Sequence, residues 1–371
     1  MKKITSLIFA LALSGAALAQ KTNYNLLIGT YTNTGKSEGI YTYQFNTLTA
    51  KTTLRHITKQ VDNPSYLAIS PDQKFVYAVN ETGNTSTVSA FKYNALTGEL
   101  SFLNKVDSQG ADPCYIIADN RNVIVANYSG GSLAVFQRKA DGSIAEAKQI
   151  IKHTGKSIDP QGRQKSAHVH MVHFSPDHKH LICNDLGEDL TYIYNYNALA
   201  KSTVLSIKTV SKTNPGSGPR HLAFSPNGRF AYLAHEFNGK ITGFAYSNGN
   251  LKKIQEIGTT PKDFAGKIDG ADIHVSADGK FLYETNRGDA NTISVFSILP
   301  TGILRFIQTV STLGKGPRNF SIDPSGKFLL VAHQYTNDVV IFKRNKITGK
   351  LTDSGQRITV GAPVCLIFDK K

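Results

Sequence analysis

The side chains best suited to chemistry in this chain are arginine, histidine and glutamate residues placed around a recurring turn. Residues 218–236, GPRHLAFSPNGRFAYLAHE, contain three of them, and the central PNGR has Pro and Gly where a tight turn needs them, between two apolar runs. This stretch predicts a β-hairpin. In a regular antiparallel register Arg220 lies opposite His235, with Glu236 one residue further out. We therefore expect an arginine, a histidine and a glutamate at the open end of one hairpin.

Copies of this turn elsewhere allow equivalent positions to be compared. It recurs as SPDQKFVYAVN, SPDHKHLICN, SADGKFLYETN and DPSGKFLLVAH. Six residues before the second residue of each turn stand Ser65, His170, Arg220, Ala271 and Arg318, and ten residues after it stand Glu81, Leu186, Glu236, Arg287 and Gln334. Both positions lie at the same end of their hairpins. We expect one pocket to be surrounded by His170, Arg220, Glu236, Arg287 and Arg318, with His168, His221, Asp272 and His274 close behind.

The repeat also predicts the fold. Its period is about 50 residues, which is typical of propeller blades, and its strands are rich in aromatic and β-branched residues with no helical stripe. NLLIGT and GIYTYQF near the start resemble the second and third strands of a copy, and GAPVCLIFD at the end resembles a first strand. The two ends therefore complete one blade, which removes exposed sheet edges. The sequence predicts an all-β, seven-bladed β-propeller, closed by pairing of N- and C-terminal strands, as a single domain over residues 20–371.

The N-terminus predicts export. Lys2 and Lys3 precede a largely apolar run over residues 4–18, followed by the small-residue site Ala17-Leu18-Ala19. This is typical of a secretory signal over residues 1–19 with cleavage before Gln20. A membrane anchor is the alternative, but the run is shorter than the ~20 residues of a spanning helix. We expect a secreted, periplasmic protein with no membrane association after cleavage.

Charge and cysteine content limit the partners. The formal net charge is +15, which favours anionic partners or a generally basic surface with no partner. The sequence has no localised basic stripe or binding module typical of nucleic-acid binding. The three cysteines, Cys114, Cys183 and Cys365, lie in apolar strand contexts, so we expect buried thiols without a disulfide. An anionic small molecule is the expected partner, bound by a monomer.

The histidine-rich segment offers three possible metal ligands, His168, His170 and His173. His168 and His170 share one face of a strand and His173 the other, and no Cys or carboxylate stands at ligand spacing beside them. The sequence has no GxSxG, Gly-rich phosphate loop or HExxH motif. We expect no metal and no cofactor. The polar insertion over residues 152–167 precedes this segment and is interpreted equally well as a functional loop or as a surface insertion.

Four segments carry a family resemblance: HVHMVHFSPD, GSGPRHLAFSPNGRFAYLAHE, DIHVSADGKFLYETNRG and GKGPRNFSIDPSGKFLLVAHQ. They resemble the seven-bladed lactonase family, which includes propeller-type 6-phosphogluconolactonases and fungal carboxymuconate cyclases. The resemblance covers nearly the whole mature chain and implies a propeller acting on lactones that bear an anionic group. It also implies that the cyclase site of one His, two Arg and one Glu corresponds to His170, Arg220, Arg287 and Glu236. His235 stands where this family usually has Asn.

A lactone hydrolase of the 6-phosphogluconolactonase type is the function that we expect. Lactone opening needs a base to activate water and positive donors where charge develops on the carbonyl oxygen. Glu236 is the expected base with His170 as its acid/base partner, while Arg220 and Arg287 stabilise the oxyanion or hold a carboxylate. The other residues are expected to bind substrate: Arg318, His168, His221, His274 and His235. A non-catalytic ligand- or protein-binding propeller and a muconate-cyclase-like lyase remain alternatives.

Overall fold

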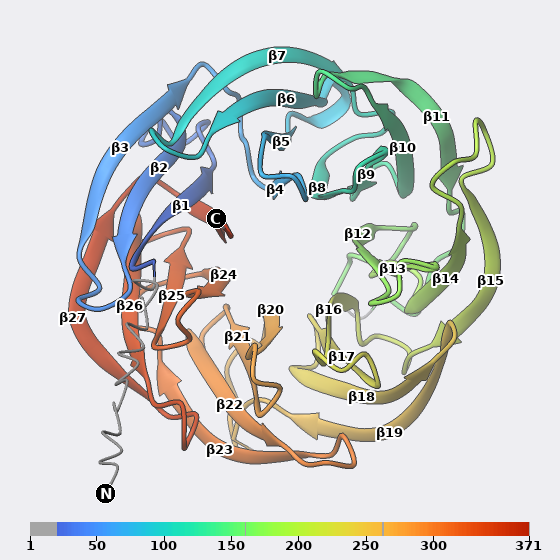
Figure 1. The fold of residues 1–371 in the computed structure, drawn as a ribbon. Helices are drawn as coiled ribbons and strands as arrows, with labels where there is room; N and C mark the ends of the chain where they lie inside the picture. Colours follow the sequence, from blue (N-terminus) through green and yellow to red (C-terminus); the bar gives the residue numbers. More distant parts are fainter. Residues whose placement is uncertain (1–20, 160, 262, 371) are drawn as a thin grey trace, which may run out of the picture.

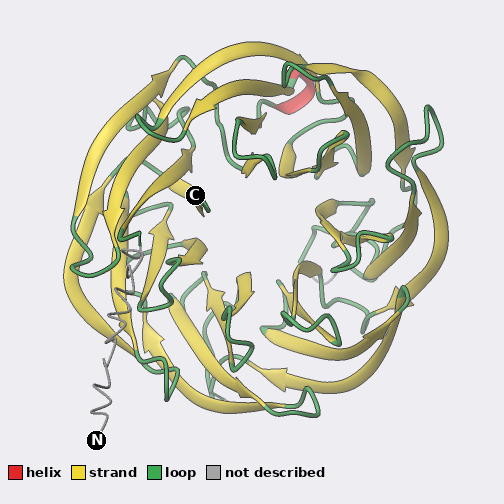
Figure 2. Cartoon of the chain, in the orientation of Figure 1, coloured by secondary structure: helices red, strands yellow, loops and turns green. Residues whose placement is uncertain are grey.

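The computed structural model describes residues 21–159, 161–261 and 263–370. These residues form a ring of β-sheets around a central axis (Figure 1). Strands and connecting loops make up almost all of the ring, and the one helix among the described residues is a short 3₁₀ turn, η1 (Gly83–Thr85) (Figure 2). The signal sequence expected over residues 1–19 lies outside the described residues. Within them, no helix is long and apolar enough to span a membrane.

The ring consists of seven four-stranded antiparallel sheets, the blades of the predicted propeller. Blade 1 has the order β28-β1-β2-β3, and blades 2 to 7 follow the chain as β4 to β7, β8 to β11, β12 to β15, β16 to β19, β20 to β23 and β24 to β27. In chain order the strands are β1 (Asn23–Thr30), β2 (Gly39–Asn46), β3 (Thr52–Lys59), β4 (Leu67–Ile69), β5 (Phe75–Asn80), β6 (Thr87–Asn94), β7 (Glu99–Asp107), β8 (Pro113–Ala118), β9 (Asn122–Asn127), β10 (Ser132–Arg138), β11 (Ile144–Lys152), β12 (Val169–Phe174), β13 (His180–Asp185), β14 (Leu190–Tyr196), β15 (Leu205–Lys212), β16 (Pro219–Phe224), β17 (Phe230–His235), β18 (Lys240–Ser247), β19 (Asn250–Gly258), β20 (Gly270–Val275), β21 (Phe281–Asn286), β22 (Thr292–Ile298), β23 (Leu304–Ser311), β24 (Pro317–Ile322), β25 (Phe328–His333), β26 (Asp338–Arg344), β27 (Leu351–Thr359) and β28 (Pro363–Phe368).

The two chain ends close the ring, as the sequence predicts. β28 pairs antiparallel with β1, with Leu26 opposite Phe368 and Ile28 opposite Leu366. Beyond the strand the carboxylate of Asp369 accepts hydrogen bonds from the backbone N–H and side-chain amide of Asn25, at 3.0 and 3.1 Å. The innermost strand of blade 1 therefore comes from the C-terminus, and its three outer strands come from the N-terminus.

The repeated turn has a physical basis in its side chains. In blade 5, Ser225 accepts a hydrogen bond from the Phe230 N–H through its hydroxyl, at 3.0 Å, and its carbonyl accepts one from the Gly228 N–H, at 2.8 Å. Gly228 has φ +69°, a conformation that glycine adopts at little cost. Each copy of this turn reverses the chain between the first and second strand of a blade, and the first strand is the one nearest the ring axis (Figure 1).

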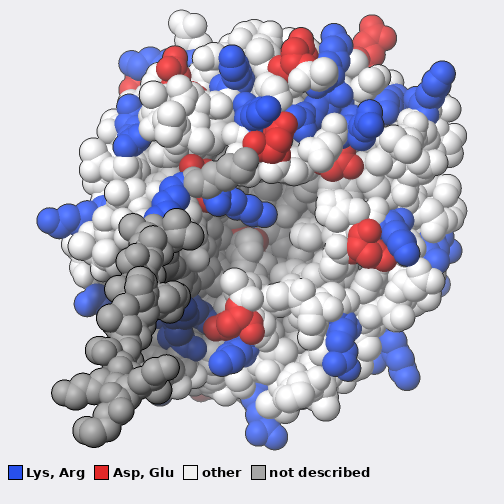
Figure 3. Space-filling model, viewed as in Figure 1, with Lys and Arg blue, Asp and Glu red and all other residues white. Residues whose placement is uncertain are grey.

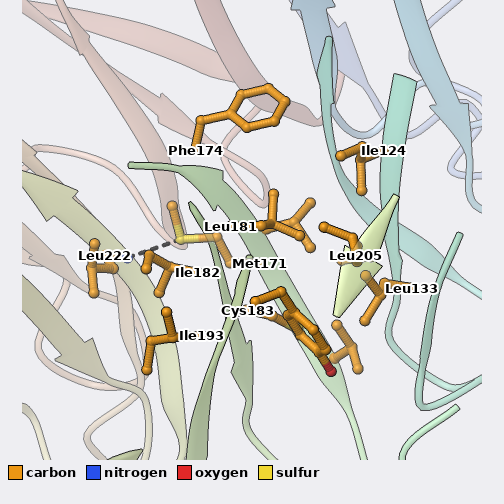
Figure 4. Packing of buried hydrophobic residues seen from close by; sticks show 14 of the residues in the cluster. Ile124, Leu133, Met171, Phe174, Leu181, Ile182, Cys183, Ile193, Leu205 and Leu222 are labelled. Atoms are coloured by element: carbon orange, nitrogen blue, oxygen red, sulfur yellow. Dashed lines mark hydrogen bonds between the residues drawn. The ribbon is translucent and has the colours of Figure 1, made fainter. Parts of the chain in front are cut away.

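The hydrophobic core lies between the blades. Figure 4 shows one interface, where Leu181 of blade 4 packs beside Ile124 and Leu133 of blade 3. On the other side Met171 reaches blade 5, and its Sδ accepts a hydrogen bond from the backbone N–H of Leu222, at 2.9 Å. Fully burying one such aliphatic side chain stabilises the fold by roughly 1.5–3 kcal/mol.

The cysteines are part of this packing. Cys114, Cys183 and Cys365 are buried and free, which confirms the prediction of buried thiols without a disulfide. Cys114 lies on β8 of blade 3 and Cys365 on β28 of blade 1, so blade 2 separates them.

Candidate active site

A bulge in the innermost strands delivers the candidate residues to the axis. In β12, Val169 pairs with Asp185 and Met171 with Asn184, which leaves His170 as an extra residue. In β24 the same shift leaves Arg318 extra, between Pro317 and Asn319. A bulge bends its strand and redirects the extra side chain, and it is common beside active sites. The equivalent position in several blades thus projects into the channel.

The same bulge corrects one detail of the sequence prediction. In blade 5, Leu222 pairs with Leu233, but Pro219 pairs with His235, so Arg220 and His221 both face Ala234. The expected pairing of Arg220 with His235 is therefore wrong, because a regular register was assumed. Its consequence is that two consecutive residues, Arg220 and His221, reach the channel.

Residues from distant parts of the chain meet on the axis. A small cavity there is lined by side chains from the innermost segments of blades 1, 2, 3, 5 and 7: Val364, Ser65, Tyr66, Cys114, Arg220, His221, Arg318 and Asn319. Further along the channel a second cavity of about 190 Å³ is lined by residues that include His173, His274 and Phe224. Figure 3 shows the hollow at the centre of one face of the ring, with basic side chains dispersed around its rim and acidic ones among them.

Glu236 is the centre of the candidate site. Its Oε1 accepts a hydrogen bond from Nη1 of Arg163. Its Oε2 lies 2.9 Å from Nε of Arg220 and 3.2 Å from Nη2 of Arg287, although neither contact has hydrogen-bond geometry. The carboxylate is 1% exposed, Arg220 2% and Arg287 8%, whereas Arg163 is 39% exposed. One buried carboxylate is thus held by three guanidinium groups, and Arg163 is the one that solvent reaches.

His170 stands beside this cluster. Its Nε2 lies 4.0 Å from Oε2 of Glu236, and its ring meets that of His221 edge-on, with 5.2 Å between centroids. On its other side Nδ1 lies 3.8 Å from Sγ of Cys114. The side chain is 5% exposed. His170 therefore directs one ring nitrogen toward the Glu236 carboxylate from inside the channel.

The charges fix the protonation states of these two groups. Burial alone would raise the pKa of Glu236, but the charges of Arg287, Arg163 and Arg220 outweigh it and hold that pKa well below its ordinary value. Burial, reinforced by Arg220, lowers the pKa of His170 well below 6.5. At neutral pH the site therefore contains a carboxylate and a neutral imidazole.

Comparisons with known proteins identify the family of this chain. Residues 25–368 match the family described as Lactonase, 7-bladed beta-propeller. The chain belongs to this family. It is 35% identical to the 6-phosphogluconolactonase of Bacillus subtilis (strain 168), over 94% of this chain and 99% of that protein, and 36% identical to the 6-phosphogluconolactonase of Formosa agariphila, over 90% and 96%. The solved structure of the Pseudomonas aeruginosa periplasmic gluconolactonase has a TM-score of 0.89 and 37% identity, covering 94% of this chain and 99% of that one.

Most of the residues predicted for this lactonase-family site do meet. His170, Arg220, Glu236 and Arg287 gather at one place. Arg318 lies on the same axis with its guanidinium over the Tyr31 ring, 5.6 Å from the centroid, and no ion pair of Arg318 occurs within the described ranges.

The four predicted histidines have different positions. His168 stacks on Tyr128, at 4.5 Å between ring centroids, so it lines the wall behind the Arg163 contact. His221 is buried beside Arg220, while His274 reaches the second cavity. His235 is directed into blade 5, where its Nε2 is 2.8 Å from the Thr242 hydroxyl. The structure therefore does not bring His235 into contact with the rest of the site.

Arg163 is the main member that sequence reasoning missed. It belongs to the insertion between β11 and β12, which has no counterpart in the repeat. Its Nη2 donates to the Tyr128 hydroxyl, at 2.8 Å, and its guanidinium lies 5.1 Å from the centroid of the Phe237 ring. From the sequence alone this insertion fits a functional loop and a surface insertion equally well, and only its length indicates a function.

Several contacts fix this insertion to blade 4. Asp185 accepts from His153, with Nδ1 at 2.7 Å, and Gln164 donates to the Leu186 carbonyl, at 2.8 Å. Glu188 accepts from the Gly155 backbone N–H. The insertion is thus attached to blade 4 by residues before and after Arg163. These contacts hold the long polar loop in place beside Glu236.

The spacing of His153, Asp185 and Glu188 would suit a metal ion, since one ligand atom of each lies within 4.8 Å of the others. Their polar atoms are already used, because His153 Nε2 contacts the Tyr194 hydroxyl at 2.9 Å and Glu188 also accepts from the Tyr192 hydroxyl. These three side chains are buried because their hydrogen bonds anchor the insertion to blade 4.

Proposed function

We propose that the chain is a lactone hydrolase that acts on an anionic, sugar-derived lactone, in the manner of its 6-phosphogluconolactonase relatives. The family and the names of these relatives support the class of reaction. The observation that carries the proposal for the site is the buried Glu236 carboxylate, held by three guanidinium groups beside a neutral His170.

His170 is the better candidate for the base that activates water. The pKa values of both groups are lowered, but a carboxyl group starts from the lower ordinary value and three cations stabilise its charged form, so Glu236 has the weaker tendency to take a proton. The imidazole of His170 is neutral at the working pH, and Nε2 faces the Glu236 carboxylate at 4.0 Å. A water between the two would lose its proton to His170, and Glu236 would stabilise the imidazolium that forms. The general-base contribution is typically about 10²–10⁴-fold.

Arg220 and Arg287 would stabilise the charge on the carbonyl oxygen. Both are buried, and their positions are fixed by other contacts: Arg220 donates to the Ala271 carbonyl, and Arg287 donates to Asp269, at 3.0 Å. Fixed positive donors in a site with little water act strongly on a developing oxyanion and cost no reorganisation during the reaction. These arginines therefore serve the transition state more than the initial binding step.

Arg163 and Arg318 would bind the anionic group of the substrate. Arg163 is the most exposed of the three arginines around Glu236, so an incoming anion meets it first. The guanidinium of Arg318 lies on the same axis and forms no ion pair within the described part of the chain. Guanidinium groups bind phosphate and carboxylate through paired charge-assisted hydrogen bonds. The phosphate or carboxylate arm of a lactone would bind to one or both of these cations.

We also propose that the protein acts in the periplasm after removal of its N-terminal signal. Two lysines followed by an apolar run and a small-residue site support export. The Pseudomonas aeruginosa relative of known structure is described as a periplasmic gluconolactonase.

The proposal is tested by following ring opening with NMR. The mature chain, residues 20–371, is incubated with 6-phosphogluconolactone, with uncharged gluconolactone and with an unsaturated diacid. Faster opening than in buffer, with preference for the phosphorylated lactone, is the expected result. Ring closure of the diacid would assign a cyclase instead, and binding without conversion would assign a binding propeller; either outcome contradicts the hydrolase.

A further inference from the structure

A line of polar groups, buried except for the partly exposed His274, runs from the second cavity to the candidate site. His274 Nε2 lies 2.9 Å from Oδ2 of Asp272, and Oδ1 of Asp272 lies 2.8 Å from Nδ1 of His221. The other ring nitrogen of His221, Nε2, lies 3.4 Å from Nη1 of Arg220. Arg220 in turn contacts Glu236 through Nε, at 2.9 Å. Asp272 and His221 thus connect to the glutamate through a single arginine.

Asp272 is surrounded by hydrogen-bond donors. Besides the two histidines, it accepts from the Asn319 side-chain amide at 2.6 Å, from the Phe320 N–H at 3.2 Å and from its neighbour Ile273 N–H at 3.0 Å. The side chain is 2% exposed. Burial alone would raise its pKa, but the charge of His274 and the hydrogen bonds from His221 and His274 hold it well below its ordinary value. Asp272 is therefore a carboxylate that can only accept hydrogen bonds.

This carboxylate selects one tautomer of His221. Burial and the charge of Arg220 lower the pKa of His221 to about 4, so the ring is neutral near pH 7 and has one N–H. Since Asp272 cannot donate, that N–H must be on Nδ1. Nε2 then carries a lone pair and faces Arg220, which can only donate. In the opposite tautomer two N–H groups would face each other across this contact.

We propose that Asp272 and His221 are positioning residues: Asp272 fixes the His221 tautomer, and His221 accepts a hydrogen bond that orients Arg220 for the reaction. The inference rests on the proposed lactone hydrolase, in which Arg220 stabilises the oxyanion. Arg220 is held by Glu236 through Nε, and by the Ala271 carbonyl and His221 through Nη1. Of these three partners, only His221 can lose its ability to accept from Arg220 by a change of tautomer, and Asp272 sets that tautomer.

Two substitutions of His221 separate this role from simple packing. The amide nitrogen of Asn occupies nearly the place of Nδ1, so His221→Asn keeps the donor toward Asp272 and loses the acceptor toward Arg220. The amide oxygen of Gln occupies nearly the place of Nε2, so His221→Gln keeps the acceptor toward Arg220. If Arg220 is positioned through Nε2, kcat should fall at least about tenfold in His221→Asn and clearly less in His221→Gln, with KM little changed in both. Equal losses in the two variants would overturn the inference.

A double-mutant cycle with Arg220→Lys tests the connection to Arg220. Residues that act through each other are not additive, so adding His221→Asn to Arg220→Lys should lower kcat little further. Fully additive losses would contradict a role through Arg220. Thermal unfolding of each variant identifies losses that arise from a destabilised fold.

One measurement does not depend on activity. With ¹⁵N-labelled histidine, protonated and unprotonated ring nitrogens have separate chemical shifts, and the His221 signal is assigned as the one that disappears in His221→Gln. The expected result is a neutral His221 with its proton on Nδ1, and loss of that state in Asp272→Asn. A proton on Nε2 in the unsubstituted protein would refute the positioning role even if lactonase activity is found. The expected tautomer in a protein that opens no lactone would refute only the proposed function.

Discussion

The substitution Glu236→Gln tests whether the charge of this carboxylate is needed both for stability and for turnover. It removes one negative charge from a site where Arg163, Arg220 and Arg287 surround it, with Oε2 at 2.9 and 3.2 Å from the latter two. Removing one member of a buried ion pair costs about 3–5 kcal/mol, because the partner charges stay buried without compensation. We expect unfolding in urea at pH 7 to show a loss of that size, and kcat/KM for the phosphorylated lactone to fall at least ~100-fold.

The matched control is Glu256→Gln. Glu256 also binds two cations, Lys240 and Lys253, each at 2.8 Å, but it is 20% exposed and lies away from the channel. Exposed pairs are worth about 0–1 kcal/mol, so this variant should be nearly as stable and as active as the parent protein. A second variant, Glu236→Gln with Arg163→Gln, removes one of the uncompensated cations and should recover part of the stability without recovering activity. Near-normal turnover in folded Glu236→Gln, or a stability change no larger than that of the control, would refute the reasoning.

Three further predictions follow from the site. Arg163→Gln should raise KM for the phosphorylated lactone about tenfold or more and change kcat/KM for uncharged gluconolactone clearly less, since only the phosphorylated lactone loses an anion contact; an equal effect on both substrates in steady-state assays would contradict anion recognition. His170→Asn should lower kcat by about 10²-fold, and in the parent protein the acid limb of the pH–rate profile should lie below pH 6.5 because the pKa of His170 is lowered; a limb at or above 6.5 would exclude His170 as the base. The free energy of unfolding should fall on acidification, because burial lowers the pKa of His221 and His235 to about 4. Between about pH 6.5 and 4 the unfolded chain binds protons that the folded chain does not, which lowers the free energy of unfolding by about 3 kcal/mol for each histidine. His274, whose pKa Asp272 raises against the effect of burial, contributes in the opposite sense, and urea unfolding at pH 7, 6 and 5 should show the net decrease; a constant or rising free energy of unfolding would contradict it.

Much of the architecture could be predicted because the repeated turn identifies equivalent positions in each blade. The turn beginning at Ser225 recurs with the same offset to the residues around it, so His170, Arg220 and Arg318 could be assigned to one end of the innermost strands. The missing first strand at the N-terminus and the unmatched strand at the C-terminus likewise predicted the closure through β28 and β1.

What could not be predicted has two physical causes. The bulge at Arg220 and His221 changes the register by one residue, and Gly218-Pro219 before it is compatible with a regular strand start as well as with a bulge, so a regular register predicts His235 opposite Arg220, whereas His235 contacts Thr242. Arg163 belongs to an insertion outside the repeat, and its contact with Glu236 depends on how blade 4 anchors that insertion, which no spacing in the sequence records.

The bulge has a consequence for how new catalysts can arise on this ring. Cys114 occupies the bulge position of blade 3, between Pro113 and Tyr115, and Ala271 lies in the bulge of blade 6. Both have small side chains that take no part in the proposed reaction. The equivalent positions in neighbouring blades hold His170, Arg220 and Arg318. Of the two, Cys114 lines the small cavity on the axis, so a substitution there would place a new functional group beside Arg220 and Arg318, whereas Ala271 is fully buried and a larger side chain would have to displace its neighbours.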